Sequence, residues 1–284
     1  MAEYNSWRIC GERMEKTFMD MIMLGTGNAM VTNCYNTCFV LRDEKGYFMV
    51  DAGGGNTVLH QLEQAGIDWR DIHTMFVTHK HIDHLLGVIW MMRRICQGMN
   101  QGKYKGEAVI YAHEEVIGLL RDMAGALLQK KQAACIGNRL YLVAVEDRES
   151  REILGKQVTF FDIQSTKAKQ FGFCMELGNG EKLTCCGDEP YNECEREYAE
   201  NSTWLLHEAF CLYKEADIFS PYEKHHSTVK DACQLAEQLH VKNLVLYHTE
   251  DKNIANRKAL YMEEGRQYYT GHLYVPDDLE VLHL

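Results

Sequence analysis

The chain has 284 residues, of which 46% are hydrophobic and 25% charged, as is typical of a globular protein with a substantial core. Its net charge of −11 comes from 30 basic and 41 acidic residues. This balance disfavours the wrapping of long nucleic acid, which needs many basic contacts to phosphate, but leaves a small-molecule or short nucleotide substrate open. Because the N-terminal residues lack an apolar signal segment and no run of 18 apolar residues occurs, we expect a cytoplasmic protein with no membrane partner.

Hydrophobic periodicity predicts a mixture of strands and helices along the chain. Predicted strands cover residues 17–24, 36–42, 46–50, 72–77, 108–112, 139–145, 157–163, 171–177, 182–186, 204–209 and 243–248. Predicted helices cover residues 56–65, 84–96, 113–131, 226–240 and 254–268. We therefore expect an α/β (α+β) fold with two sheets in contact and helices outside. We expect one domain over residues 1–284, in two halves of about 18–155 and 156–284.

The 11 cysteines have no C-x-x-C spacing. That pattern indicates reduced, buried thiols and not a disulfide framework.

The strongest chemical signal is the run His79-Lys80-His81-Ile82-Asp83-His84, directly after a predicted strand. In an extended segment, side chains two residues apart project the same way, so His79 and His81 can point to a common centre. Asp83 and His84 follow where a helix begins. Imidazole and carboxylate groups are the ligands expected for zinc, iron or manganese. We expect Lys80 to face solvent.

This H-x-H-x-D-H run resembles the signature of the metallo-β-lactamase superfamily, which implies a four-layer αββα sandwich. In that family a bridging carboxylate follows a late strand in a Gly-Asp segment, and a last histidine ends another apolar strand. The resemblance implies that Asp188 bridges two metal ions and that His248 is a further ligand. The alternative is that each of these two residues is structural.

The resemblance is closer to the RNase Z branch. Its motifs are similar to residues 24–28 (LGTGN), 51–55 (DAGGG), 206–209 (LHEA) and 226–228 (HST). In that branch the glutamate and histidine of the last two motifs act beside the metals. Glu208 would then orient His226, and His226 would donate a proton to the leaving group or stabilise the phosphate. A buried salt-bridging glutamate and a structural histidine at a helix N-terminus are the alternatives. His225 is the less favoured partner because His226 directly precedes Ser-Thr.

One departure from the family lies at Gln164, where a further histidine ligand is expected. An amide oxygen is a weaker zinc ligand than imidazole, though it binds harder cations. The first metal site would keep His79, His81 and Asp188, with Gln164 or water as fourth ligand. The second would keep Asp83, His84, Asp188 and His248. We therefore expect two divalent ions, zinc by default with manganese or iron as alternatives, and a weaker first site.

A second departure concerns the extended arm with which tRNA-processing members grip tRNA. Some of them carry it between the missing histidine and the bridging aspartate. Only the 23 residues 165–187 lie between Gln164 and Asp188, enough for two strands and a turn. With the acidic net charge, this favours a small phosphodiester over pre-tRNA.

Three hypotheses about function remain open. The first is a two-metal phosphodiesterase in which Asp83 orients a metal-activated hydroxide. The second is a hydrolase of another ester, a lactone or a thioester. The third is a metal-binding scaffold that has lost catalysis, for which Gln164 is the evidence. The resemblance also leaves a homodimer open.

Overall fold

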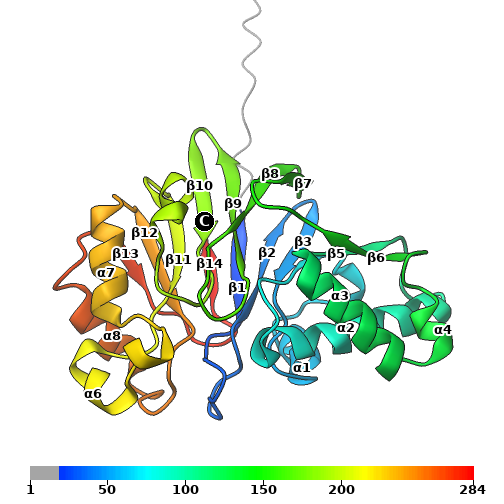
Figure 1. Ribbon diagram of the computed structural model, residues 1–284, viewed down its shortest axis with the longest axis horizontal. Coiled ribbons are helices and arrows are strands. Elements are labelled where there is room, and N and C mark those ends of the chain that lie inside the picture. Colours follow the sequence, from blue (N-terminus) through cyan, green and yellow to red (C-terminus); the bar gives the residue numbers. More distant parts are fainter. Residues whose placement is uncertain (1–18) are drawn as a thin grey trace, which may run out of the picture.

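The computed structural model describes residues 19–284, and two seven-stranded sheets face each other at its centre (Figure 1). The strand order is β14-β1-β2-β3-β4-β5-β6 in the first sheet and β13-β12-β11-β10-β9-β8-β7 in the second. The strands are β1 (Asp20–Gly25), β2 (Cys38–Asp43), β3 (Gly46–Val50), β4 (Thr74–Phe76), β5 (Ala108–Ala112), β6 (Leu140–Ala144), β7 (Ser150–Ile153), β8 (Lys156–Asp162), β9 (Phe171–Gly178), β10 (Glu181–Cys185), β11 (Trp204–Glu208), β12 (Asn243–Tyr247), β13 (His272–Tyr274) and β14 (Val281–His283).

Helices cover the outer faces of both sheets (Figure 1). On the first sheet lie α1 (Thr57–Gln64), α2 (Ile82–Asn100), α3 (Glu114–Leu127) and α4 (Lys130–Ala133); on the second lie α7 (Val229–Gln238) and α8 (Arg257–Gly265). Two short helices, α5 (Arg196–Ala199) and α6 (Ala216–Phe219), lie in the connections of the second half, as do 3-10 turns at 193–195, 213–215 and 222–224. A further 3-10 turn covers 69–71. The predicted α/β four-layer sandwich is confirmed.

Aromatic side chains fill the space between the sheets. The ring of Phe173 lies 5.6 Å from Phe48, 5.9 Å from Phe76 and 6.5 Å from Phe39, centroid to centroid. All four side chains are buried. Burial of each such side chain contributes about 1.5–3 kcal/mol, so this core holds the two sheets, and the loops at their edge, in a fixed relation.

Several predicted boundaries differ from the structure for local reasons. The long helix predicted over 113–131 is broken at Leu128, whose extended backbone ends α3 before α4 begins. The helix predicted from residue 226 begins at Val229, because Thr228 caps it and accepts a hydrogen bond from the Asp231 N–H. The short strands β7, β13 and β14 have no counterpart among the predicted strands. The start of the first predicted strand, at 17–18, lies outside the described residues.

The ends of the parallel strands supply the residues of interest. β3, β4 and β5 are parallel neighbours in the first sheet, and β10, β11 and β12 are parallel neighbours in the second. Polar residues stand at or just after the carboxyl ends of these strands: Asp51, His79, His113, Asp188, Glu208 and His248. In open α/β sheets this edge is the usual place for a ligand.

Residues 19–284 show the state of the cysteines and the character of the helices. The ten cysteines of this range are all unpaired, and eight of them are buried. No helix within the range combines the length and apolar character needed to cross a bilayer.

Candidate metal centre

The run His79–His84 turns from the end of β4 into the first turn of α2. His81 has an extended backbone at the N-cap position of α2, and Asp83 and His84 lie in the first helical turn. His79 Nε2 and His81 Nδ1 are 2.8 Å apart, so their side chains point to a common place as the spacing predicts. Lys80 faces outward, where it forms an ion pair with Glu115 on α3.

The start of α2 is fixed against the glycine loop after β3. The Ala52 N–H donates to the His84 carbonyl at 3.0 Å, and the Gly87 N–H donates to the Gly53 carbonyl at 2.8 Å. A Cβ on Gly87 would lie 1.7 Å from the carbonyl oxygen of Ala52. Only glycine therefore permits this close approach of helix and loop.

Asp51 in this loop orients two histidines of the run. Its Oδ2 accepts from His84 Nδ1 at 2.7 Å and from the Thr78 hydroxyl at 2.8 Å, while its Oδ1 accepts from the Thr78 N–H at 2.8 Å. The Thr78 oxygen also lies 3.0 Å from His79 Nδ1. The contact between His84 Nδ1 and this carboxylate turns Nε2 toward Asp188 and Asp83, the orientation found in metal-binding histidines. The sequence interpretation gave Asp51 no role, although its acidic glycine loop was the available signal.

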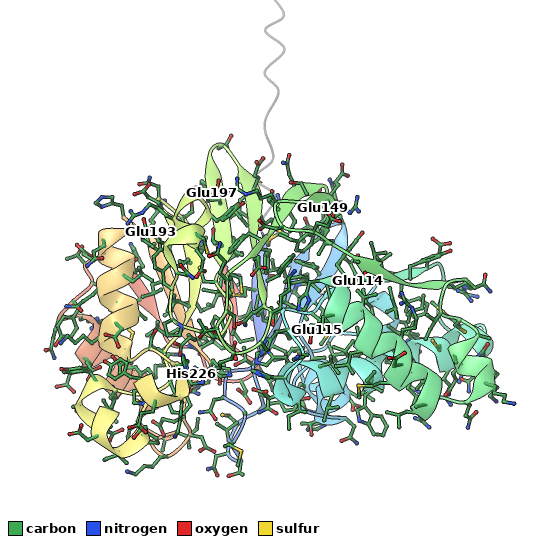
Figure 2. All side chains as sticks on the ribbon, viewed as in Figure 1. Glu114, Glu115, Glu149, Glu193, Glu197 and His226 are labelled. Carbon is green, nitrogen blue, oxygen red and sulfur yellow. The ribbon has the colours of Figure 1, made fainter. Side chains whose placement is uncertain are left out.

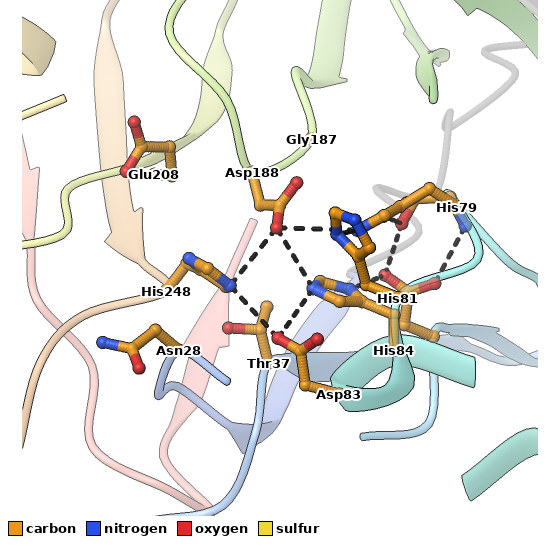
Figure 3. Close-up of polar contacts among 12 residues, drawn as sticks. Asn28, Thr37, His79, His81, Asp83, His84, Gly187, Asp188, Glu208 and His248 are labelled. Carbon is orange, nitrogen blue, oxygen red and sulfur yellow. Dashed lines mark hydrogen bonds and ion pairs between the residues drawn. The ribbon is translucent and has the colours of Figure 1, made fainter. Parts of the chain in front are cut away.

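Asp188 lies at the middle of the cluster, and Asp83 closes it from below (Figure 3). Asp188 Oδ2 is 3.3 Å from Nε2 of both His84 and His248, and 3.7 Å from His79 Nε2. Asp83 Oδ2 is 3.4 Å from the same nitrogens of His84 and His248. One carboxylate oxygen is thus shared by imidazoles from both halves of the chain, as expected of a bridging ligand.

Electrostatic coupling inside the cluster shifts its pKa values. The neighbouring carboxylates raise the pKa of His84 well above its ordinary value, against the effect of burial. Burial alone would raise the pKa of Asp188, but the neighbouring His79 and His248 hold it well below its usual range. The pKa of Asp83 is likewise lowered by His84 and His248 against the effect of burial. Burial lowers the pKa of His79 well below its ordinary value. These carboxylates are therefore ionised and His79 is neutral near pH 7, which are the forms that bind cations.

The glycine turn after β1 positions His248. His248 follows β12 with a left-handed backbone, φ 57°, and the next residue is clamped on both sides. The Thr249 N–H donates to the Thr26 carbonyl, and the Asn28 N–H donates to the Thr249 carbonyl. Hydrogen bonds to the turn at residues 25–28 therefore hold the backbone in place and offset the strain of the left-handed conformation at His248.

Glu208 and His226 lie together beside His248. The Nδ1 atom of His226 is 3.6 Å from Glu208 Oε2, and Glu208 Oε1 accepts from the Ser227 N–H. The His226 ring stacks on Phe210 with a centroid distance of 4.8 Å. In Figure 2, His226 lies at the edge between the two halves, far from the surface acidic residues Glu149, Glu193 and Glu197. The structure thus brings these two predicted residues together and next to the cluster.

Gln164 is the one predicted site residue that the structure leaves apart. It lies on an exposed turn after β8 with φ 55°, and its backbone N–H donates to Asp162. Its role as a ligand stays a prediction. Gln170, at the start of β9, is buried there instead, and its Nε2 donates to Asp188 Oδ1 at 2.6 Å. No motif marks Gln170 in the sequence.

Two adjoining cavities open onto the cluster. One of about 520 Å³ is lined by His81, Asp83, Asp188, Lys167 and His226, among others. The other, of about 410 Å³, is bordered by His226 and His248 and has an apolar wall that includes Phe210 and Phe219. A larger cavity of about 720 Å³ near Trp69 and Arg94 contains none of the clustered residues, so the first two are the relevant ones.

The cluster fits divalent cations. His84 Nε2 is fully buried and has no hydrogen-bond partner, a costly state that metal coordination would relieve. Three sets of residues can each offer ligand atoms within 4.8 Å of one another: His79 with His84 and Asp188, Asp83 with His84 and His248, and Glu208 with His226 and His248. Nitrogen and carboxylate oxygen are the donors that zinc, iron and manganese accept.

The two facing mixed sheets, with this histidine–aspartate cluster at their edge, define a protein of the metallo-β-lactamase fold. Over residues 19–268 the sequence matches the family model described as Anti-Pycsar protein Apyc1. The chain belongs to this family.

Relatives and solved structures agree with that assignment. Ribonuclease Z of Thermococcus onnurineus (strain NA1) is 24% identical over 314 residues, which cover 93% of this chain and 94% of the relative. The metallo-β-lactamase fold protein YhfI from Bacillus subtilis superposes with a TM-score of 0.76 at 15% identity, covering 94% of this chain and 100% of that one. Zinc-bound PqqB from Methylobacterium extorquens gives a TM-score of 0.71 at 12% identity, covering 93% and 100%.

Proposed function

We propose that this protein is a metal-dependent phosphodiesterase that hydrolyses a small phosphodiester, such as a ribonucleotide derivative, with two divalent metal ions. The observation that carries the proposal is Asp188 Oδ2, which lies 3.3 Å from both His84 Nε2 and His248 Nε2. The similarity to ribonuclease Z and the His–Asp cluster support a hydrolase of this kind.

His79, His81 and Asp188 would hold one ion, and Asp83, His84, Asp188 and His248 the other. Bound zinc, or a similar ion, lowers the pKa of its water toward neutrality and neutralises charge on substrate oxygens. In this proposal Asp83 accepts a hydrogen bond from the attacking water. Zinc is the default choice, and zinc-bound PqqB of the same fold supports it.

His226 would assist the departure of the leaving group. Its Nδ1 faces the buried carboxylate of Glu208, which leaves Nε2 as the nitrogen available to a substrate. Stacking on Phe210 fixes the plane of the imidazole ring. In this proposal the Glu208 carboxylate, 3.6 Å from His226 Nδ1, favours a proton on that nitrogen and orients the ring, as a general acid needs.

The cavities favour a small anionic substrate with an apolar or aromatic part. Lys167 lines the cavity that contains the clustered residues, so its ammonium group can attract a phosphate. Phe210 and Phe219 line the adjoining cavity, where a flat group can stack. The segment between Gln164 and Asp188 forms only β9, β10 and the turn that joins them. It therefore contains no arm of the kind that grips tRNA.

The second candidate is hydrolysis of a carboxylic ester, a lactone or a thioester. The apolar wall of Phe210 and Phe219 favours it, because such a wall also accommodates an uncharged acyl group. A third candidate is a metal-binding scaffold without catalysis, which the glutamine in place of the expected histidine at position 164 favours.

A substrate panel with matched histidine variants separates these candidates. Zinc- or manganese-loaded protein is assayed on bis(p-nitrophenyl) phosphate, linear and cyclic nucleotide phosphodiesters, pre-tRNA, p-nitrophenyl acetate and a thioester. We expect phosphodiester hydrolysis to dominate. His226→Asn should lower kcat by about 10²–10⁴-fold on nucleotides, the range of general acid catalysis, and by less on p-nitrophenyl esters, whose leaving group needs no proton.

His225→Asn is the matched control, because His225 is the exposed neighbour of His226. It should leave kcat within about twofold of the unmodified protein, since it lies outside the proposed machinery. Faster hydrolysis of the acetate or thioester than of every phosphodiester would support the second candidate. Stoichiometric metal binding without turnover on the whole panel would support the scaffold.

A further inference from the structure

We propose that Gln170 is a positioning residue that fixes Asp188 so that only one of its carboxylate oxygens is left for metal ions. The inference rests on the metal centre of the proposed function. Gln170 Nε2 donates to Asp188 Oδ1 at 2.6 Å, while Asp188 Oδ2 faces the imidazoles of both halves. The two oxygens of Asp188 therefore have different partners. The hydrogen bond from the Gln170 amide fixes Oδ1 and leaves Oδ2 to face the imidazoles.

The Gln170 side chain is tightly confined. It is 1% exposed, and its Nε2 also lies 3.2 Å from Nδ1 of His79. An amide N–H between a carboxylate and an imidazole cannot act as a metal ligand through that atom, because amide nitrogen carries no available lone pair. Gln170 Nε2 thus lies beside His79 as a hydrogen-bond donor to Asp188 and not as a metal ligand.

Gly187 makes the room that this contact needs. Its φ of +77° is a conformation that side chains rarely adopt, and an added Cβ would lie 2.7 Å from Gln170 Nε2. Glycine is therefore required before Asp188 for two reasons: the backbone has a positive φ, and a side chain would collide with the Gln170 amide. The contact with Gln170, a residue outside the Gly-Asp motif, thus explains why glycine precedes Asp188.

The backbone around Gln170 ties it to both sheets. The Ile163 N–H donates to the Gln170 carbonyl, and the Phe171 N–H donates to the Thr78 carbonyl. Thr78 follows β4 of the first sheet and directly precedes His79, whereas Phe171 begins β9 in the second sheet. Gln170 is therefore placed at the junction of the two halves, and its amide has little freedom to turn away from Asp188.

Removal of the amide would free Asp188 Oδ1. The carboxylate could then rotate or chelate a single ion through both oxygens, at the expense of the bridge. Loss of such supporting hydrogen bonds to metal ligands typically costs about 10–100-fold in metal affinity or activity. The effect should fall on the geometry of the bound ions and on kcat, while substrate affinity, set by the cavity walls, should change little.

The test is cobalt binding to the full chain carrying Gln170→Met, which keeps the length of the side chain and removes the donor. Cobalt(II) is titrated while the visible absorption bands report coordination geometry and calorimetry reports affinity. We expect an altered spectrum and about 10–100-fold weaker binding of one cobalt equivalent. Gln157→Met, at an exposed glutamine on β8 outside the proposed metal centre, is the matched control and should behave as the unmodified protein.

Gln170→Asn gives a second variant in case the first unfolds. It withdraws the amide by one methylene group and should show the same spectral change in weaker form. An unaltered cobalt spectrum and affinity in the folded variants would overturn the inference, as would an unmodified protein that binds no cobalt. If the spectrum changes as expected although the unmodified protein hydrolyses no phosphodiester, the proposed function fails while the role of Gln170 stands.

Discussion

The two sides of Asp188 differ in how completely the chain holds them. On one side, Asp83, His84 and His248 are at most 5% exposed, and their facing atoms lie 3.4 Å apart. On the other, His79 is paired with the partly exposed His81, and the position of the expected fourth ligand, Gln164, lies on an exposed turn. The site of Asp83, His84 and His248 is therefore almost fully enclosed by protein. The site of His79 and His81 is more open, and its geometry relies on Asp188 and on Gln170. Preorganisation before binding is what separates a tight site from a weak one.

The largest expected effect comes from Asp188, which the two sides share. Asp188→Ala should abolish tight binding of both ions and lower kcat by more than the roughly 10²–10³-fold that loss of one electrostatic stabiliser costs. The measurements are metal content after dialysis and turnover of the best phosphodiester. Retention of one tightly bound ion with unchanged affinity would show that the sides are independent and would break the comparison.

A matched pair of histidine variants sharpens the comparison. His248→Ala should remove the tighter ion and His81→Ala the weaker one, because His248 is enclosed and His81 partly exposed. Calorimetric titration with zinc against a competing chelator measures both affinities. The opposite assignment of tight and weak ions would mean that preorganisation does not rank the sites.

A smaller effect is expected at Asp51, which touches no substrate cavity but orients His84. Asp51→Asn keeps the size of the side chain and weakens the hydrogen bond to His84 Nδ1, now 2.7 Å. Loss of such a partner costs about 10–100-fold in metal affinity. Because Thr78 links Asp51 to His79 as well, both affinities should fall, with the larger change at the His84 side. Equal losses of affinity at the two sites would indicate that the indirect link from Asp51 through Thr78 to His79 matters as much as the direct contact with His84.

Much of the centre is readable from sequence because its residues follow strands. His79, His81, Asp83 and His84 lie within six residues, so their proximity requires only a strand, a turn and a helix start. Asp188, Glu208 and His248 end strands of the second sheet, and parallel strands carry their ends to one edge. Their positions were therefore predictable once the order of elements was known.

Gln170 and Asp51 could not be found in the same way. Gln170 contacts Asp188 only because β9 begins at the junction of the sheets, which no local pattern encodes. Asp51 lies in a visible glycine loop, but its partner His84 is on a helix whose approach depends on Gly87. Gln164 suits the place of the missing histidine in the sequence, but the structure puts it on an exposed turn, so its role as a ligand stays a prediction. The edge strands β7, β13 and β14 are short, and three or four residues carry too little periodicity for prediction.

The smallest effect on the metal centre is expected from Glu195. This residue tests whether buried groups near Cys186, two residues before Asp188, stabilise the fold there. Glu195 is fully buried near Cys186, and its Oε1 accepts from the Asn192 N–H. Burial raises the pKa of Glu195 to about 8 from an ordinary value of 4.5. The folded chain therefore retains a proton that the unfolded chain loses between these values.

The sign of the pH effect follows from that difference. The stabilising contribution of protonated Glu195 is complete below about pH 4.5 and declines as the pH rises toward 8, by at most about 1.4 kcal/mol per pH unit. Glu195→Gln keeps the acceptor oxygen and removes the titration. Its free energy of unfolding relative to the unmodified chain, measured by urea denaturation at fixed metal concentration, should therefore rise from pH 5 to pH 8. A constant difference across that range would mean that Glu195 ionises normally, and that water reaches the segment behind Asp188.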